Sequence, residues 1–187
     1  MSRKSANDNS KDGWSAGASG DGWSASARGD KEGGCCYAPS TPVHMSDGTV
    51  QTIDSLKKGD RILSLIKGKL ETVFVKKITR SYNLLYNLPY GHKPNIIQAT
   101  ADHKFMTRRG GIRVDHLRPE DDFVYMLQSD GTFSWVSIGT ISLDSRLMKR
   151  VVEIRTHDSG NCIVGSIIGY NYSQMRQLRE FLNKLMI

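Results

Sequence analysis

Leucine, isoleucine, valine and phenylalanine are absent from residues 1–34 of this chain, although they recur throughout the rest of it. A segment of this kind has almost no apolar surface to offset the conformational entropy that folding removes. It also carries an imperfect Asp-Gly-Trp-Ser-Ala repeat, which begins at Asp12 and again at Asp21. We therefore predict that residues 1–34 are a disordered linker or upstream flank.

Long apolar runs are also missing. The chain has no run of roughly 18 apolar residues, the length typical of a membrane-spanning helix. Its N-terminus lacks the apolar region of a secretory signal. We therefore expect a soluble protein with no membrane partner, for which a cytoplasmic location is favoured, unless the chain is a fragment of a longer polypeptide.

Cysteine is scarce, and Cys35, Cys36 and Cys162 are the only ones. An odd count with two adjacent residues excludes a framework of disulfides. The net charge is +7, but the Lys and Arg residues are scattered. No aromatic residues are interleaved with a basic stripe, as binding of single-stranded nucleic acid would require. We therefore expect no specific nucleic-acid partner.

From Val43 onward, short runs of β-branched and aliphatic residues alternate with turn signals such as Asp47-Gly48 and Gly110-Gly111. This pattern predicts strands divided by tight turns. The predicted strands lie at residues 61–66, 71–76, 95–100, 123–127, 135–138, 151–155 and 162–165. With about 150 residues outside the flank, the chain is long enough for one all-β domain with its own core.

Two stretches of the domain resemble each other. Residues 43–63 and 105–124 each read as a hairpin, a short helical turn ending at a leucine, an acidic turn and a strand. Chance similarity between hairpins is the alternative, but the match extends through turn and strand positions, so we favour a duplication. Two such halves can pair about a pseudo-two-fold axis, with the functional site where they meet.

The period of the apolar residues changes at the end of the chain. Apolar side chains recur at helical spacing between Tyr172 and Ile187, with charged residues between them. We predict a C-terminal amphipathic helix over residues 172–187. Because its polar face carries few charges, we expect it to pack on the domain or on a partner rather than on a membrane.

A thiol at the border between flank and domain can attack the peptide bond just upstream of it, and proximity makes that attack intramolecular. Cys36 occupies this border. Cleavage also needs donors for the developing oxyanion and a proton for the departing amide nitrogen. Thr100 and His103 follow a predicted strand and can fill these roles, and the adjacent Asp102 can orient the imidazole.

These residues resemble the Hint superfamily, the autoprocessing domains of hedgehog proteins and inteins. The opening motif corresponds to Cys36-x4-Thr41-x-Val43, followed by Asp47-Gly48 and Leu56-x-x-Gly59-Asp60; the second to Thr100-x-x-His103; and the closing block to Val152-Glu-Ile and the segment from Asn161 to Asn171. Within the superfamily, the chain is most similar to the bacterial-intein-like and von Willebrand-associated groups.

The resemblance implies a horseshoe-shaped, pseudo-two-fold Hint fold over residues 35–171 and a self-directed reaction without metal or cofactor. Cys36 would attack the carbonyl of Cys35 in an N-to-S acyl shift and give a thioester. Thr100 and His103 would stabilise the intermediate and protonate the leaving nitrogen. The upstream segment is then the substrate, and water, a thiol or an amine is the acyl acceptor. Asn171 would cyclise and cut the chain before Tyr172.

Three departures from the family pattern qualify these expectations. Tyr172 stands where a splicing intein needs Cys, Ser or Thr, so ligation of the flanks is not expected. Tyr170 and Gly160 stand where the family usually has histidines, which weakens the case for cyclisation of Asn171. Cleavage at Cys36 is therefore the primary expectation.

Cys162 occupies an apolar position in a predicted strand, so we assign it a buried, inert role. The alternative to self-cleavage is a catalytically degenerate Hint fold that acts as a protein-binding module. A Cys/His protease acting on other proteins is disfavoured, since a thiol at the first residue of a domain is placed for attack in cis.

Overall fold

The computed structural model of the chain describes residues 36–92, 95–157 and 161–170. Within these ranges the regular structure is β-strand except for two short 3-10 helices, which confirms the predicted all-β class. No helix in these ranges has the length and apolar character needed to cross a membrane. The predicted linker, Cys35, Asn171 and the C-terminal helix lie outside the described residues.

The elements follow one another as β1 (Cys36–Tyr37), β2 (Pro42–His44), β3 (Val50–Thr52), η1 (Ile53–Ser55), β4 (Arg61–Ile66), β5 (Lys69–Asn83), β6 (Tyr86–Tyr90), β7 (Asn95–Ala99), β8 (Lys104–Thr107), β9 (Gly110–Arg113), η2 (Val114–His116), β10 (Phe123–Leu127), β11 (Phe133–Ser137), β12 (Ser142–Leu143), β13 (Lys149–Thr156), β14 (Asn161–Val164) and β15 (Ile167–Tyr170).

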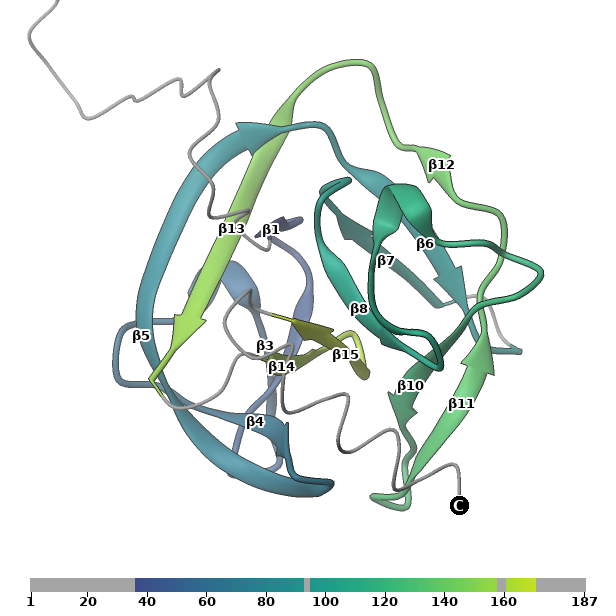
Figure 1. The fold of residues 1–187 in the computed structure, drawn as a ribbon. Helices are drawn as coiled ribbons and strands as arrows, with labels where there is room; N and C mark the ends of the chain where they lie inside the picture. The colour runs from purple at the N-terminus through teal and green to yellow at the C-terminus, as the bar shows by residue number, and fades with distance from the viewer. Residues whose placement is uncertain (1–35, 93–94, 158–160, 171–187) are drawn as a thin grey trace, which may run out of the picture.

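The strands form two antiparallel sheets that curve around a common interior (Figure 1). The order is β12-β6-β7-β1-β13-β5-β4 in the first sheet and β11-β10-β8-β15-β14-β2-β3 in the second, with β9 paired on β8. Strand β5 is fifteen residues long and pairs first with β4 and then with β13. This one strand therefore makes the long curve at the left of Figure 1.

The predicted duplication is present in the order of the elements. β2, β3, η1 and β4 in the first half match β8, β9, η2 and β10 in the second. The acidic turns are also alike, with one residue of difference in spacing: Lys57 N donates to the carboxylate of Asp60, three residues on, at 2.7 Å, and Arg118 N donates to the carboxylate of Asp122, four residues on, at 2.7 Å. Each of these turns directly follows a buried leucine, which anchors it to the core.

Strand β1 precedes the first repeat and β7 precedes the second, and these two strands pair antiparallel with Tyr37 opposite Ala99. In the other sheet, the β14–β15 hairpin lies between β2 of one half and β8 of the other. The halves thus meet at the β1–β7 ladder and at this hairpin. The candidate residues Cys36, Thr100 and His103 come from the same junction, as predicted.

Alternation of side chains builds the core. In β5, Val73 and Val75 are buried while the residues on either side of each are exposed, because successive side chains of a strand point to opposite faces. The principal buried cluster contains Tyr37, Phe105 and Val164, together with aliphatic side chains from both halves. Full burial of each such side chain contributes about 1.5–3 kcal/mol.

Asn161 joins the two sheets through its side chain. It is buried at the start of β14, where its Oδ1 accepts from Leu65 N at 3.0 Å and its Nδ2 donates to Leu65 O at 2.8 Å. Ser64 Oγ also donates to Oδ1. The amide thus pairs with β4 as a strand backbone would, and satisfies two backbone groups that are shut off from water.

Replacing Asn161 with alanine is expected to lower the free energy of unfolding by about 2–4 kcal/mol, because the Leu65 N–H and C=O are left buried without partners. Urea denaturation followed by circular dichroism measures the change. Asn83→Ala is the matched control, since Asn83 Oδ1 accepts from Leu84 N at an exposed site, and it should cost less than about 1 kcal/mol. Equal losses in the two variants would contradict this account.

Candidate active site

The backbone of Cys36 is held by the strand that leads to Thr100. Thr100 N donates to Cys36 O at 3.0 Å, and Ala38 N donates to Gln98 O at 3.1 Å. The N–H and C=O of a strand residue point toward the same neighbouring strand. In a hydrogen-bonded antiparallel pair, each residue donates its N–H to the C=O of the other. The amide nitrogen of Cys36, which would be the leaving group in cleavage, therefore faces Thr100.

A tight turn places His103 beside this position. His103 N donates to Thr100 O at 3.0 Å, and Val114 N donates to His103 O at 2.8 Å. If the β1–β7 ladder continued, Thr100 O would accept from Cys36 N–H. Here it accepts from His103 N instead. The turn thus ends the ladder at Cys36 and puts both predicted side chains, Thr100 and His103, at its end.

Both of these side chains are buried and carry an unpartnered polar atom. Thr100 is 1% exposed and His103 is 0% exposed. Thr100 Oγ1 and His103 Nδ1 have no hydrogen-bond partner among the described residues. Because a buried polar atom without a partner costs free energy, such a pair at the end of a ladder marks these two groups as candidates for contact with a ligand.

The His103 ring packs on Tyr37 and Phe105, with ring centroids 4.2 and 4.6 Å apart. Its Nε2 lies 2.6 Å from Tyr37 Oη. Burial lowers the pKa of His103 to about 3, so the imidazole is neutral near pH 7. The hypothesis that Asp102 orients this ring is wrong, since neither ring nitrogen is bonded to its carboxylate.

Tyr37 is the contact residue that the sequence-based reasoning missed. It lies directly after Cys36, is 1% exposed and reaches across 66 residues of sequence to His103. The available signal was its position in β1. A large aromatic one residue beyond the thiol must point to the opposite face of the strand, toward the core.

The thiol of Cys36 lies on the other face of β1. Cys36 belongs to a small buried cluster with Ala38, Leu85 and Val151, whereas Tyr37 belongs to the main core. The structure therefore brings the Cys36 backbone to Thr100 and His103 but places thiol and imidazole on opposite faces of the strand. The imidazole therefore does not share a face of β1 with the sulfur.

The pKa of the Cys36 thiol is raised to about 12, first by burial and then by the negative charges of Glu153 and Asp102. Glu153 lies directly opposite Cys36 in the β1–β13 ladder. A hydrogen bond with the Ser81 side chain acts in the other direction and lowers this pKa. The thiol is therefore protonated near neutral pH, and its attack requires loss of that proton.

Cys162 is buried in β14, and burial raises the pKa of its thiol to about 12. A protonated, inaccessible thiol fits the predicted inert role. Among the described residues, no group of three or more His, Cys, Asp and Glu side chains is placed to hold a metal ion.

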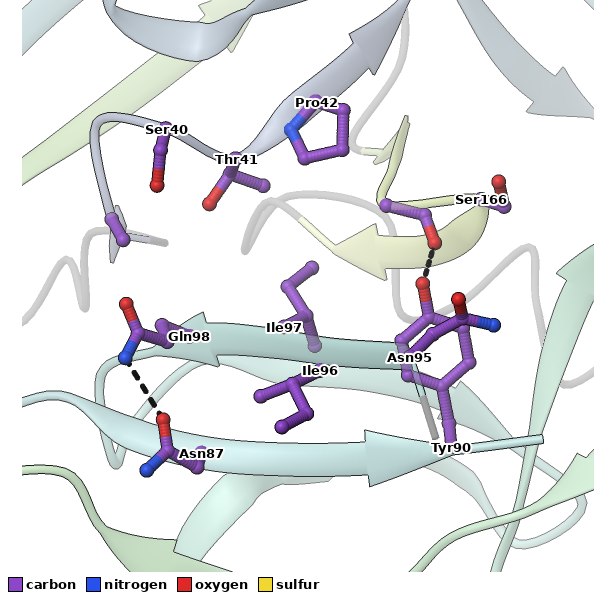
Figure 2. Close-up of a pocket in the computed structure, with 12 residues that line it drawn as sticks. Ser40, Thr41, Pro42, Asn87, Tyr90, Asn95, Ile96, Ile97, Gln98 and Ser166 are labelled. Atoms are coloured by element: carbon purple, nitrogen blue, oxygen red, sulfur yellow. Dashed lines mark hydrogen bonds between the residues drawn. The ribbon is translucent and has the colours of Figure 1, made fainter. Parts of the chain in front are cut away.

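A cavity of about 510 Å³ lies near the ladder, between the segment Ser40–Pro42 and strand β7 (Figure 2). Its wall is fixed by hydrogen bonds from Gln98 to Asn87 and from Tyr90 Oη to Gly165 O. Every side chain lining it is uncharged, and none of the candidate residues Cys36, Thr100 and His103 contributes to it. The cavity is thus distinct from the candidate active site.

The neutral state of His103 predicts a pH-dependent stability. Its pKa is lower in the folded chain than in the unfolded one, so stability is complete above about pH 6.5 and falls as the pH drops toward 3, by up to about 1.4 kcal/mol per pH unit. Urea unfolding at a series of pH values should show a smaller acid loss in His103→Gln. The control is His116→Gln at a side chain 70% exposed. Equal pH slopes in His103→Gln and the unmodified chain would refute the assignment.

Solved structures that resemble this chain include inteins and an intein-like domain. A DnaB intein from Synechocystis sp. PCC 6803 superposes with a TM-score of 0.66 at 22% identity, covering 74% of this chain and 99% of the intein. The TvoVMA intein gives 0.66 at 16% identity, covering 75% and 99%. A bacterial intein-like domain from Clostridium thermocellum gives 0.62 at 18% identity, covering 73% and 98%.

Neither the models of protein families nor the curated proteins contain a match to this chain. At these identities the structural similarity concerns the fold, and it confirms the predicted architecture: the described part of the chain has the Hint fold.

Proposed function

We propose that this chain, which has the Hint fold, cleaves its own backbone between Cys35 and Cys36 through an N-to-S acyl shift. One observation carries the proposal. The Cys36 backbone is paired with Thr100 at the end of the β1–β7 ladder, where Thr100 Oγ1 and His103 Nδ1 are buried without partners. These two groups are the nearest support for the proposal that a hydroxyl and an imidazole act on the peptide bond before Cys36.

In the proposed reaction each residue has one role. The Cys36 sulfur forms a bond to the carbonyl carbon of Cys35, and the bond from that carbon to the Cys36 nitrogen breaks. The Thr100 hydroxyl donates to the developing oxyanion. His103 passes a proton to the nitrogen, and the proton that the sulfur loses to solvent replaces it, so the imidazole stays neutral overall. The resulting thioester passes the upstream segment to water, a thiol or an amine.

A second cut before Tyr172 by cyclisation of Asn171 stays a prediction. What supports it is the path of β15, whose last residue Tyr170 pairs with Lys104, the residue after His103. The chain therefore leaves its last described strand beside the candidate site. Asn171 itself lies outside the described residues.

One observation favours the alternative, a degenerate Hint fold that binds another protein. The thiol is buried and its pKa is about 12, which is the state of an inert cysteine rather than of a free nucleophile. The two functions differ in a covalent event, so a mass measurement separates them.

We expect a tag fused upstream of the chain to be released as a fragment ending at Cys35, faster with added thiol or hydroxylamine, because both attack a thioester. Cys36→Ala should abolish release, and Thr100→Ala and His103→Ala should slow it by about 10²–10⁴-fold. Intact mass spectrometry over time measures each rate. Cys162→Ala is the control and should cleave normally. A fusion that stays whole under all these conditions would establish the binding module instead.

Removing the charge of Glu153 should accelerate cleavage. Glu153→Gln lowers the pKa of Cys36 by removing a neighbouring negative charge, so the rate near pH 7 should rise severalfold, by roughly the factor that one nearby charge supplies. The rate should increase with pH in both proteins, with the profile of the variant shifted to lower pH. Glu71→Gln, at an exposed position of β5, should leave the profile in place. An unshifted profile in Glu153→Gln would contradict the electrostatic coupling.

A further inference from the structure

We propose that Tyr37 is a positioning residue for His103: its hydroxyl donates to Nε2 and so fixes the imidazole tautomer that carries its proton on Nδ1. The tautomer is our inference from the short contact between Tyr37 Oη and His103 Nε2. Only its consequence for cleavage rests on the proposed function. Two independent features, the direction of one hydrogen bond and the absence of a side chain at Gly169, lead to this assignment.

The separation of the two atoms indicates which one donates. Tyr37 Oη and His103 Nε2 lie 2.6 Å apart. Bonds donated by a hydroxyl fall at about 2.5–3.0 Å, whereas N–H···O bonds fall at about 2.7–3.2 Å. The contact therefore fits the tyrosine hydroxyl as donor. A neutral imidazole has one donor and one acceptor nitrogen, so an accepting Nε2 leaves the proton on Nδ1.

Gly169 makes room for this contact. A Cβ on Gly169 would overlap the Tyr37 hydroxyl and would lie 2.8 Å from His103 Nε2. The φ angle of Gly169 is not positive, so the backbone conformation does not require a glycine here. In the ladders, Gly169 pairs with Cys162 on one side and Phe105 on the other. The absent side chain therefore has a packing reason, which is to let Tyr37 reach the imidazole.

The tautomer matters for the leaving group. With its proton on Nδ1, the unpartnered nitrogen is a donor and can serve the Cys36 amide nitrogen. As the carbon–nitrogen bond breaks, that nitrogen takes the Nδ1 proton, and Nε2 takes the proton of Tyr37. The proton lost by the Cys36 thiol returns to the tyrosine through solvent water, so the protons balance, and His103 ends as the other neutral tautomer, with its proton on Nε2 and Nδ1 bare.

Nuclear magnetic resonance of the ring nitrogens tests the tautomer without any cleavage. In the full chain carrying Cys36→Ala, which preserves the upstream segment, ¹⁵N-labelled His103 should show a protonated Nδ1 and a bare Nε2. Adding Tyr37→Phe, which keeps the ring but removes the donor, should shift His103 toward the other tautomer, and Gly169→Ala should do the same by displacing Tyr37. A protonated Nε2 with Tyr37 in place would overturn the proposal.

Kinetics test the consequence. In the otherwise unmodified chain with an upstream tag, Tyr37→Phe should slow cleavage by at least about tenfold, while Tyr125→Phe, a tyrosine of β10 stacked on Phe133, should cleave at the native rate. A native rate in Tyr37→Phe would overturn the positioning role. If no variant and no unmodified chain cleaves, the proposed function fails, and the ring nitrogens still decide the tautomer.

Discussion

The hydrogen bond from Thr100 N to Cys36 O is the interaction on which the candidate site depends. It fixes the end of β1 against β7 and so joins the two halves of the fold at one residue pair. The turn that follows Thr100 is closed by the hydrogen bond from His103 N to Thr100 O, which places His103 next to the residue that pairs with Cys36. A duplicated half-domain thereby produces an asymmetric site, because only one of its two equivalent strands carries the thiol.

Local patterns made much of the fold predictable. The predicted strands at 61–66 and 123–127 coincide with β4 and β10, since alternation and flanking turns are encoded within a few residues. Strand β6 was missed because Pro89 argues against a strand. Proline lacks the N–H that a strand residue donates. Pro89 nevertheless lies opposite Ile96 of β7, and its carbonyl accepts from Gly139 N on the edge of β6 that faces away from β7. Strand β15 was missed because the turn that separates it from β14 is only two residues long, Gly165 and Ser166. Ser166 has a φ of +68°, which a serine does not announce in the sequence.

Sequence proximity misled the reasoning about the imidazole. Asp102 is the neighbour of His103 in the chain, yet its charge acts on the Cys36 thiol. Tyr37 is 66 residues away and makes the contact. That contact depends on how β1, β8 and β15 pack together, and on Gly169 having no side chain. No local pattern contains this information, whereas Thr100 and His103 were recognisable because a short motif holds both of them on one turn.

Burial sets the chemistry on both faces of β1. It keeps the imidazole neutral and the thiol protonated, with pKa values of about 3 and 12. Ionising such a thiol at pH 7 costs about 7 kcal/mol, at about 1.4 kcal/mol per pH unit. Holding a nucleophile against its target can supply about 7–11 kcal/mol. Proximity within the folded chain is therefore large enough to offset the penalty, whereas a thiol reacting with a separate molecule would bear it in full. Under the proposed function, such a site would act once, on the peptide bond that precedes Cys36.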